Sequence, residues 1–131
     1  MDLQLTGKVA LVTGASVGLG RAIARMLAAE GCRLAILARR RPLLEELARE
    51  LPASATPLVI EQDICTPDAA ARIRDAVLGH FGRCDILVNN AGGSRPQADL
   101  GSDAVWEEAM ELNFQAGRRI THALIPAMQA N

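Results

Sequence analysis

Short apolar runs alternate with longer amphipathic segments along the whole chain. Each run is followed by a glycine, a proline or a polar cluster that would stop a strand. Runs of this length without polar alternation are typical of strands that are buried on both faces of a parallel sheet. The predicted strands cover residues 9–12, 34–37, 58–60 and 85–88.

The segments between these runs have apolar residues at helical spacing and recognisable ends. Gly31 and Gly82 follow two predicted helices, Pro42 opens one, and Thr66 is expected to cap the next. Ser102 or Asp103 is expected to cap a short helix through Trp106, with a longer helix after it. The expected inward faces are Leu19, Ile23, Met26 and Leu27; Leu43, Leu44, Leu47 and Leu51; Ile73, Val77 and Phe81; and Leu112, Ala116, Ile120, Ala123 and Leu124.

The resulting order is βαβαβαβα with short connections and no linker. Such alternation favours an α/β fold with helices on both faces of the sheet, joined by right-handed crossovers. We therefore expect residues 1–131 to form a single three-layer, Rossmann-type domain, a doubly wound parallel sheet with strand order 3-2-1-4. In that order the strand at 85–88 lies at an edge. An apolar edge invites pairing, so we expect a homo-oligomer, formed through this edge or the last helix.

Composition adds mainly exclusions. The 131 residues are 50% hydrophobic and 22% charged, with a formal net charge of −1, which favours a globular domain and no nucleic-acid partner. No apolar run is long enough to cross a bilayer and the N-terminus has no signal-peptide pattern, so we expect a cytoplasmic protein without a membrane partner. Three separated cysteines are interpreted as buried, reduced hydrophobes, and the two histidines have no metal-ligand spacing.

A glycine-rich turn joins the first strand to the first helix, from Thr13 to Gly20. Gly14 suits a tight turn, Gly18 lets a pyrophosphate approach the backbone, and Gly20 lets helix and strand pack closely. The N–H groups at the helix start would face the phosphates. The alternative is a glycine-rich turn without a ligand. A Walker-type loop is excluded because the turn has no lysine.

The end of the second strand indicates which nucleotide is bound. An acidic residue there would accept the ribose 2′-hydroxyl, but Ala38 occupies the position and Arg39 and Arg40 follow. Guanidinium groups bind phosphates, so NADP(H) is the expected cofactor, with NAD(H) possible. The alternative is a solvated basic helix start, although cations are unfavourable at that end of a helix.

Four motifs in this order resemble the short-chain dehydrogenase/reductase family: the turn from Thr13 to Gly20, Asp63-Ile64 after the third strand, Asn89 to Gly92 after the fourth, and Asn113. The resemblance implies an oxidoreductase that transfers hydride between a nicotinamide and a carbonyl or alcohol substrate. It assigns Asn113 to the catalytic set. The cofactor-binding residues would be Gly14, Ser16, Gly18, Leu19, Gly20, Arg39, Arg40, Asp63, Ile64, Asn90, Ala91 and Gly92.

Simpler roles stay open for three of these polar residues. Asn89 is expected to brace the sheet, Asp63 could cap backbone N–H groups, and Asn113 could merely bend its helix. The sequence from Asn89 to Pro96 is similar to the corresponding segment of 3-oxoacyl-carrier-protein-reductase-like members of the family.

One departure from the family limits the prediction. Its proton transfer needs a tyrosine and a lysine four residues later, yet the chain has no tyrosine and its only lysine is Lys8. We therefore expect the cofactor-binding half of an enzyme, truncated before that segment and inactive alone. The alternative is a non-catalytic nucleotide-binding module. A methyltransferase is disfavoured. Nucleotide sites in methyltransferases usually have an acidic residue at the end of the second strand for the ribose hydroxyls, and this chain has Arg39 there.

Overall fold

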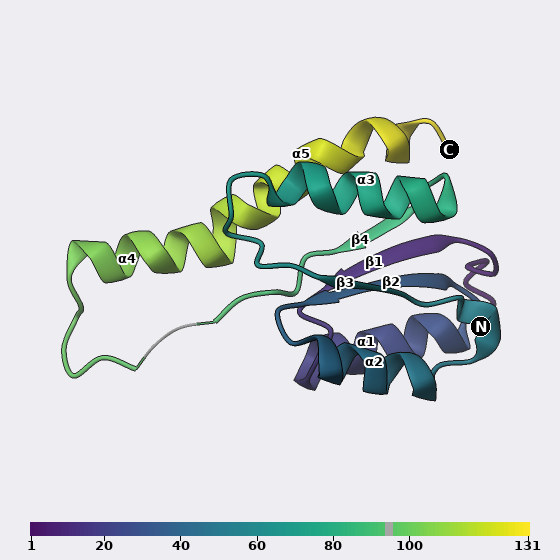
Figure 1. The fold of residues 1–131 in the computed structure, drawn as a ribbon, viewed down its shortest axis with the longest axis horizontal. Coiled ribbons are helices and arrows are strands. Elements are labelled where there is room, and N and C mark those ends of the chain that lie inside the picture. The colour runs from purple at the N-terminus through teal and green to yellow at the C-terminus, as the bar shows by residue number, and fades with distance from the viewer. Residues whose placement is uncertain (94–95) are drawn as a thin grey trace.

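Parallel strands form the centre of the computed structural model, which describes residues 1–93 and 96–131. The sheet order is β3-β2-β1-β4, as predicted, and β1 lies between its two partners (Figure 1). Val12 of β1 is opposite Ile36 on one side and Val88 on the other. The strands are β1 Val9–Thr13, β2 Arg33–Ala38, β3 Leu58–Glu61 and β4 Ile86–Val88.

Two helical layers cover this sheet, which confirms the three-layer α/β architecture. Helices α1 and α2 lie on one face and α3 and α5 on the other (Figure 1). Side chains along β1 alternate between the two cores: Ala10 and Val12 pack under α1 and α2, whereas Val9 and Leu11 pack under α3 and α5. The helices are α1 Gly18–Ala29, α2 Arg41–Glu50, the 3₁₀ turn η1 Ala53–Ala55, α3 Ala69–Phe81, α4 Asp103–Met110, the π turn η2 Glu111–Gln115 and α5 Ala116–Gln129.

The predicted inward face of α1 is wrong in part. Leu19 and Met26 are 70% and 65% exposed, and the fully buried positions are instead Gly20, Ala24 and Ala28. Small side chains on this face let the helix lie close to the sheet, so larger side chains are left at its margins. The predicted faces of α2, α3 and α5 hold better, with buried residues Leu44, Leu47 and Leu51, Ile73 and Val77, and Ala116, Ile120 and Leu124.

Helix α3 begins at Ala69 and not next to Thr66. The Thr66 carbonyl accepts the N–H of Ala69 in a turn, and its hydroxyl donates to the carbonyl of Asp63 at 3.1 Å. The Thr66 side chain is therefore used within the preceding loop, so it is not the helix cap that we expected.

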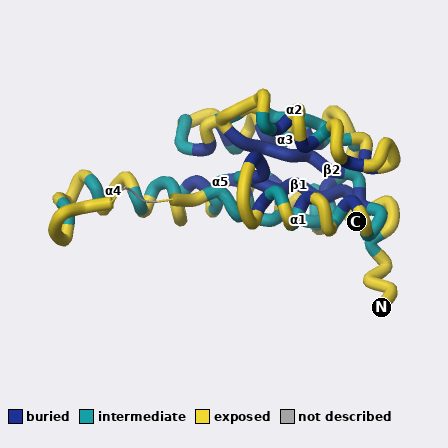
Figure 2. Tube along the Cα trace, turned by 90° about the horizontal axis from the view of Figure 1, so that it is seen from below, coloured by how far each residue is buried: buried dark blue, intermediate teal, exposed yellow. Residues whose placement is uncertain are grey.

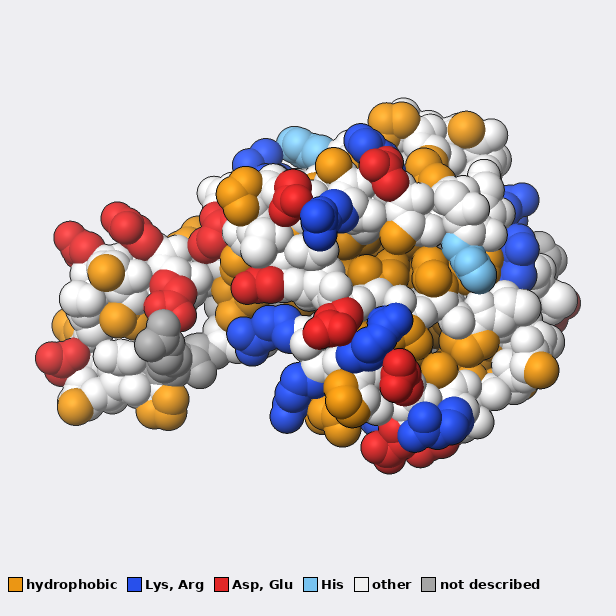
Figure 3. Space-filling model, viewed as in Figure 1, with side chains coloured by type: hydrophobic (Ala, Val, Ile, Leu, Met, Phe, Trp, Pro, Cys, Tyr) orange, Lys and Arg blue, Asp and Glu red, His pale blue; other side chains and the backbone are white. Residues whose placement is uncertain are grey.

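Helices α4, η2 and α5 follow one another without a break, where two separate helices were expected. Their first part, together with the residues just before α4, projects from the body as an arm, defined here as residues 99–114 (Figures 1 and 2). The Ser102 hydroxyl accepts the N–H of Val105 at 3.4 Å, which confirms the predicted cap. No residue of α4 is buried. Acidic and hydrophobic side chains gather on the arm in Figure 3. Of the arm residues, Trp106, Met110 and Phe114 are each more than half exposed.

The cysteines differ from one another in burial. Cys32 and Cys84 are buried, as expected, whereas Cys65 is half-buried beside the carboxyl end of β3, and all three are free thiols. Within residues 1–93 and 96–131, no helix has the length and apolarity needed to span a bilayer.

Candidate nucleotide-binding site

The polar segments predicted for the site converge at the carboxyl ends of the strands. They surround a cavity of about 850 Å³, which is within the range of small-molecule and cofactor sites. The cavity lies where the chain crosses from one side of β1 to the other, the usual ligand position in open α/β sheets. Predicted residues in its wall are Gly14, Ser16, Arg39, Arg40, Asp63, Ile64, Asn90, Ala91 and Gly92.

Several predicted site residues are not in this wall. Gly18, Leu19 and Gly20 lie at the start of α1, and Asn113 lies behind the loop that follows β4. The sequence interpretation also missed wall residues, among them Gln62 and Cys65 on the β3–α3 loop and Glu111 and Leu112 on η2. Nothing in the local sequence singles these out, because they reach the cavity only through the position of η2 and the β3–α3 loop.

The glycine turn has no room for side chains at two positions. Gly14 has φ +65°, and a Cβ there would come within 2.9 Å of the Cα of Ala91. A Cβ at Gly20 would collide with the carbonyl oxygen of Gly14 and the side-chain amide of Asn90. The expected close packing at Gly20 is therefore against the turn itself and the β4 loop, not against the strand. Gly18 has φ +60° and faces open space.

Thr13 ties the turn to the loop after β4. Its hydroxyl, on a side chain that is almost fully buried, accepts the backbone N–H groups of Asn90 and Ala91 at 3.0 Å each. It donates in turn to the carbonyl of Val88 at 3.3 Å. The side-chain amide of Asn90 donates to the carbonyl of Gly14 at 3.1 Å. These bonds fix two walls of the cavity relative to each other. Thr13 was not among the predicted site residues, although a single polar residue at the end of an apolar strand could have indicated it.

Asn89 has a different role from the one expected. Its side-chain amide donates to the hydroxyl of Thr121 at 2.9 Å, so it joins the β4 loop to α5 and not to the sheet. Thr121 also donates to the carbonyl of Gly117 one turn earlier. Asn90, expected to line the cofactor, both lines the cavity and braces the glycine turn.

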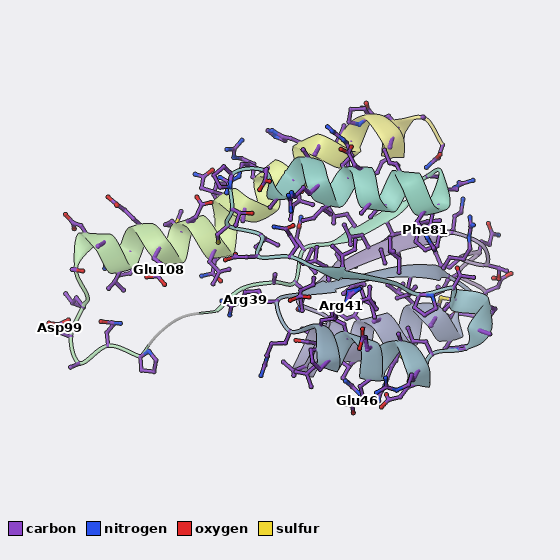
Figure 4. The ribbon with its side chains drawn as sticks, in the orientation of Figure 1. Arg39, Arg41, Glu46, Phe81, Asp99 and Glu108 are labelled. Carbon is purple, nitrogen blue, oxygen red and sulfur yellow. The ribbon has the colours of Figure 1, made fainter. Side chains whose placement is uncertain are left out.

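Arg39 and Arg40 lie at the mouth of the cavity. Both are exposed, and within residues 1–93 and 96–131 neither forms an ion pair, whereas the next residue, Arg41, pairs with Glu45 at 3.4 Å. Figure 4 shows Arg39 beside the carboxyl ends of the strands. Unpaired guanidinium groups at a helix start form a site where an anion would be stabilised.

The loop after β3 is ordered by its own hydrogen bonds. Asp63 accepts the N–H of Cys65 on its carboxylate at 2.9 Å, so the capping role considered for it is present. The side chain of Gln62 donates to the carbonyl of Asp63 and to the hydroxyl of Thr66. Burial, with the charge of Asp63, raises the pKa of the Cys65 thiol, which therefore stays neutral in the cavity wall.

Asn113 fastens the helix to the β4 loop. Its amide donates to the carbonyls of Gly93 at 2.7 Å and Ala109 at 2.9 Å, and its carbonyl oxygen accepts the N–H of Gly93 at 2.9 Å. It lies in the middle of η2, a π turn, and such turns are frequent at functional sites. The irregular helix geometry considered for Asn113 is therefore present, and its assignment to the catalytic set stays a prediction.

This sheet order, the glycine turn at its switch point and the cavity beside it define a Rossmann-like α/β protein. Residues 8–131 match the sequence model of the short chain dehydrogenase family. The chain therefore belongs to the short chain dehydrogenase family.

Relatives with known names or structures agree with this assignment. A short chain dehydrogenase of Pseudocercospora fijiensis is 41% identical over 131 residues, which is 95% of this chain and 42% of that protein. The structure of L-sorbose reductase from Gluconobacter frateurii with NADPH and L-sorbose superposes with a TM-score of 0.91 at 37% identity, covering 99% of this chain and 51% of that one. A 3-ketoacyl-(acyl-carrier-protein) reductase from Brucella melitensis with NADH has a TM-score of 0.86 at 32% identity, covering 97% and 52%. The chain thus spans about half the length of these relatives, or less.

The prediction of a 3-oxoacyl-reductase subtype rests on the stretch from Asn89 to Pro96. That stretch includes residues 94 and 95, which lie outside the described residues. The subtype therefore stays a prediction.

Proposed function

We propose that this chain is the cofactor-binding part of an NADP(H)-dependent oxidoreductase that transfers hydride between nicotinamide and a carbonyl or alcohol substrate. The observation that carries the proposal is the convergence of the glycine turn, Arg39, Asp63 and the β4 loop around one cavity. A glycine turn alone would be weak support. Four separate segments in one wall are strong support, because each matches a different part of a dinucleotide.

The residues present fit such a cofactor. The N–H groups at the start of α1 would hold the pyrophosphate, with the open space at Gly18 allowing its approach. Asp63 and Ile64 would contact the adenine end, and Asn90, Ala91 and Gly92 the ribose and nicotinamide end. The cofactor supplies the hydride chemistry, while the protein binds and orients it.

The preference for NADP(H) is the finer part of the proposal. It is supported by Arg39 and Arg40, which lack protein counter-ions in the described part of the chain, and by Ala38 in place of an acid. One similar protein was solved with NADPH and another with NADH, so the family accepts both cofactors. The two arginines favour the 2′-phosphate through charge-assisted hydrogen bonds.

We propose only one catalytic residue in this chain. Asn113 is the one described residue that we assign to the catalytic set, and the 131 residues contain no tyrosine. We therefore expect this chain to bind cofactor without turning over substrate. The second candidate function, a non-catalytic nucleotide-binding module, is favoured by the same missing tyrosine and predicts the same binding.

The substrate is proposed no more finely than a carbonyl or alcohol. The two similar proteins are named for different substrates, L-sorbose and a 3-ketoacyl carrier protein. The cytoplasmic location and the self-association expected from the sequence stay predictions.

Titration of NADPH and of NADH, followed by their fluorescence, tests the proposal. We expect NADPH to bind about tenfold more tightly than NADH, which corresponds to one charge-assisted contact. The R41A variant is the control for the role of Arg39 and Arg40, and it should keep the same preference. It removes an equal charge from the next position, where Arg41 pairs with Glu45 and lies outside the cavity wall. No binding of either nucleotide would overturn the proposed function, and equal binding would overturn the preference.

A further inference from the structure

Glu111 and Arg119 form an ion pair across the π turn. The two guanidinium nitrogens of Arg119 reach both carboxylate oxygens of Glu111, one of them at 3.4 Å. Glu111 is the first residue of η2, and Arg119 lies beyond its end in the first turn of α5. The pair therefore encloses the whole of the irregular segment.

The spacing of this pair fits a π turn and not a regular helix. An α-helix turns about 100° per residue, so residue i+7 lies about 20° from residue i around the axis and residue i+8 about 80° away. A π turn contains one residue more, and the N–H of Ala116 donates to the carbonyl of Glu111 in this i→i+5 pattern. Arg119 thus takes the place around the axis that residue i+7 has in a regular helix, and it faces Glu111.

The π turn also positions the groups that matter at the site. Asn113, at its centre, makes three hydrogen bonds to Gly93 and Ala109. Glu111 and Leu112 lie in the cavity wall. A return to regular α-helix would rotate these side chains by about one residue, or 100°, relative to Arg119.

We propose that the Glu111–Arg119 ion pair is a latch that holds the π turn, and that Arg119 is a positioning residue for Asn113 and for this wall of the cavity. The latch deepens the proposed function, because it would hold the Asn113 clamp, defined as the three hydrogen bonds of Asn113 to Gly93 and Ala109, beside the proposed cofactor site. Its effect on the clamp itself does not depend on what the cavity binds.

Two features distinguish this pair from an ordinary surface ion pair. Both side chains are about one third exposed, and the contact uses both oxygens, the geometry in which an ion pair contributes most. By contrast, Asp68 and Arg72 on α3 have the regular i,i+4 spacing and are each more than 60% exposed. That spacing brings two side chains together in any regular α-helix, so the Asp68–Arg72 pair does not depend on a π turn.

Hydrogen exchange measured by NMR on the chain without cofactor tests the latch. The probes are the backbone N–H of Gly93, which donates to Asn113, and the side-chain amide of Asn113, which donates to Gly93 and to Ala109. In E111Q and in R119M we expect both to exchange at least about tenfold faster than in the unchanged chain. R118M is the matched control, because it removes the same charge from the neighbouring position, where the guanidinium donates to Gln115 at 2.8 Å.

A charge-reversed double variant tests the ion pair independently, including the case in which a single variant folds poorly. E111R/R119E restores an ion pair of the same spacing, so exchange should return to within about threefold of the unchanged chain. Unchanged exchange in both single variants would overturn the latch. Faster exchange in R119M alone would also overturn it, because an unpaired Glu111 charge and not the lost pair would then be the cause.

The outcome separates the latch from the proposed function. Loss of clamp protection in E111Q and R119M supports the latch even when the unchanged chain binds no NADPH. Titration of NADPH against the same variants then adds a second readout. We expect R119M to weaken binding more than E111Q, because only R119M leaves an unpaired negative charge in the wall of the cavity proposed to hold the anionic cofactor.

Discussion

The hydroxyl oxygen of Thr13 accepts the backbone N–H of Ala91 at 3.0 Å, and so joins the end of β1 to the loop after β4. T13V keeps the shape of the side chain but leaves the N–H groups of Asn90 and Ala91 without this acceptor. We expect a loss of about 1–3 kcal/mol in the free energy of unfolding, measured by urea denaturation. T13S retains the hydroxyl and should lose less than half as much, so equal losses in both variants would contradict the assigned role.

Gly20 is the position at which an added methyl group should be least tolerated. G20A places a Cβ against the carbonyl of Gly14 and the amide of Asn90, so one of the cavity walls has to move. We expect at least about 2 kcal/mol of destabilisation, together with weaker nucleotide binding. G79A is the matched control in α3, where a Cβ meets nothing within 4 Å. It should stabilise the chain by up to about 1 kcal/mol through helix propensity.

Arg39 and Arg40 should determine the choice of cofactor. We expect R39A/R40A to weaken NADPH binding by about 10- to 100-fold and to change NADH binding by less than about threefold, because only NADPH carries the 2′-phosphate. A38D should strengthen NADH relative to NADPH by supplying a hydroxyl acceptor at the end of β2. Fluorescence titration of both cofactors measures the ratio, and a parallel loss of NADH affinity would show that the arginines act on general folding.

Acid should destabilise the chain through Asp85. A bidentate bond from Arg83 lowers the pKa of this carboxyl most, and the N–H of Val9 adds to the effect. Because the folded-state pKa is below the unfolded value of about 3.9, this stabilisation is complete above that value. It is lost as the pH falls through the lower, folded-state pKa.

Two variants identify the source of this pH dependence. D85N removes the titrating group, and R83M removes the main cause of the shift. Both should flatten the decline of the free energy of unfolding below about pH 4, measured by denaturant titration at several pH values. A decline as steep as in the unchanged chain would show that other carboxyl groups, such as Glu50 or Glu111, whose pKa values arginines also lower, are responsible.

Self-association is expected from two apolar surfaces. In the described sheet β4 pairs only with β1, and the arm exposes Trp106, Met110 and Phe114. Sedimentation velocity at tens of micromolar protein should show dimers or larger species. F114K should reduce association if the arm forms the contact, and leave it unchanged if the β4 edge does. A monodisperse monomer would contradict the prediction.

The features that depend on local sequence were predictable. Apolar runs located the strands, and their alternation with helices led to the order β3-β2-β1-β4. The φ of +65° at Gly14 and the cap at Ser102 follow from the chemistry of one or two residues. The convergence of Arg39, Asp63 and Asn90 on one cavity followed in turn, because parallel strands end at the same edge of their sheet.

Other features depended on distances between segments far apart in the chain. Only the tertiary structure assigned Asn90 to the glycine turn and Asn89 to Thr121, because two neighbouring asparagines look alike until their partners are in place. The exposure of Met26 to solvent likewise became evident only from the tertiary structure. The same is true of the Glu111–Arg119 pair, which spans a π turn whose extra residue shifts every later side chain around the helix axis. The sequence by itself determined the strands, turns and caps, since each depends on a few adjacent residues. The tertiary structure decided which side chains meet, since that depends on how closely whole elements pack.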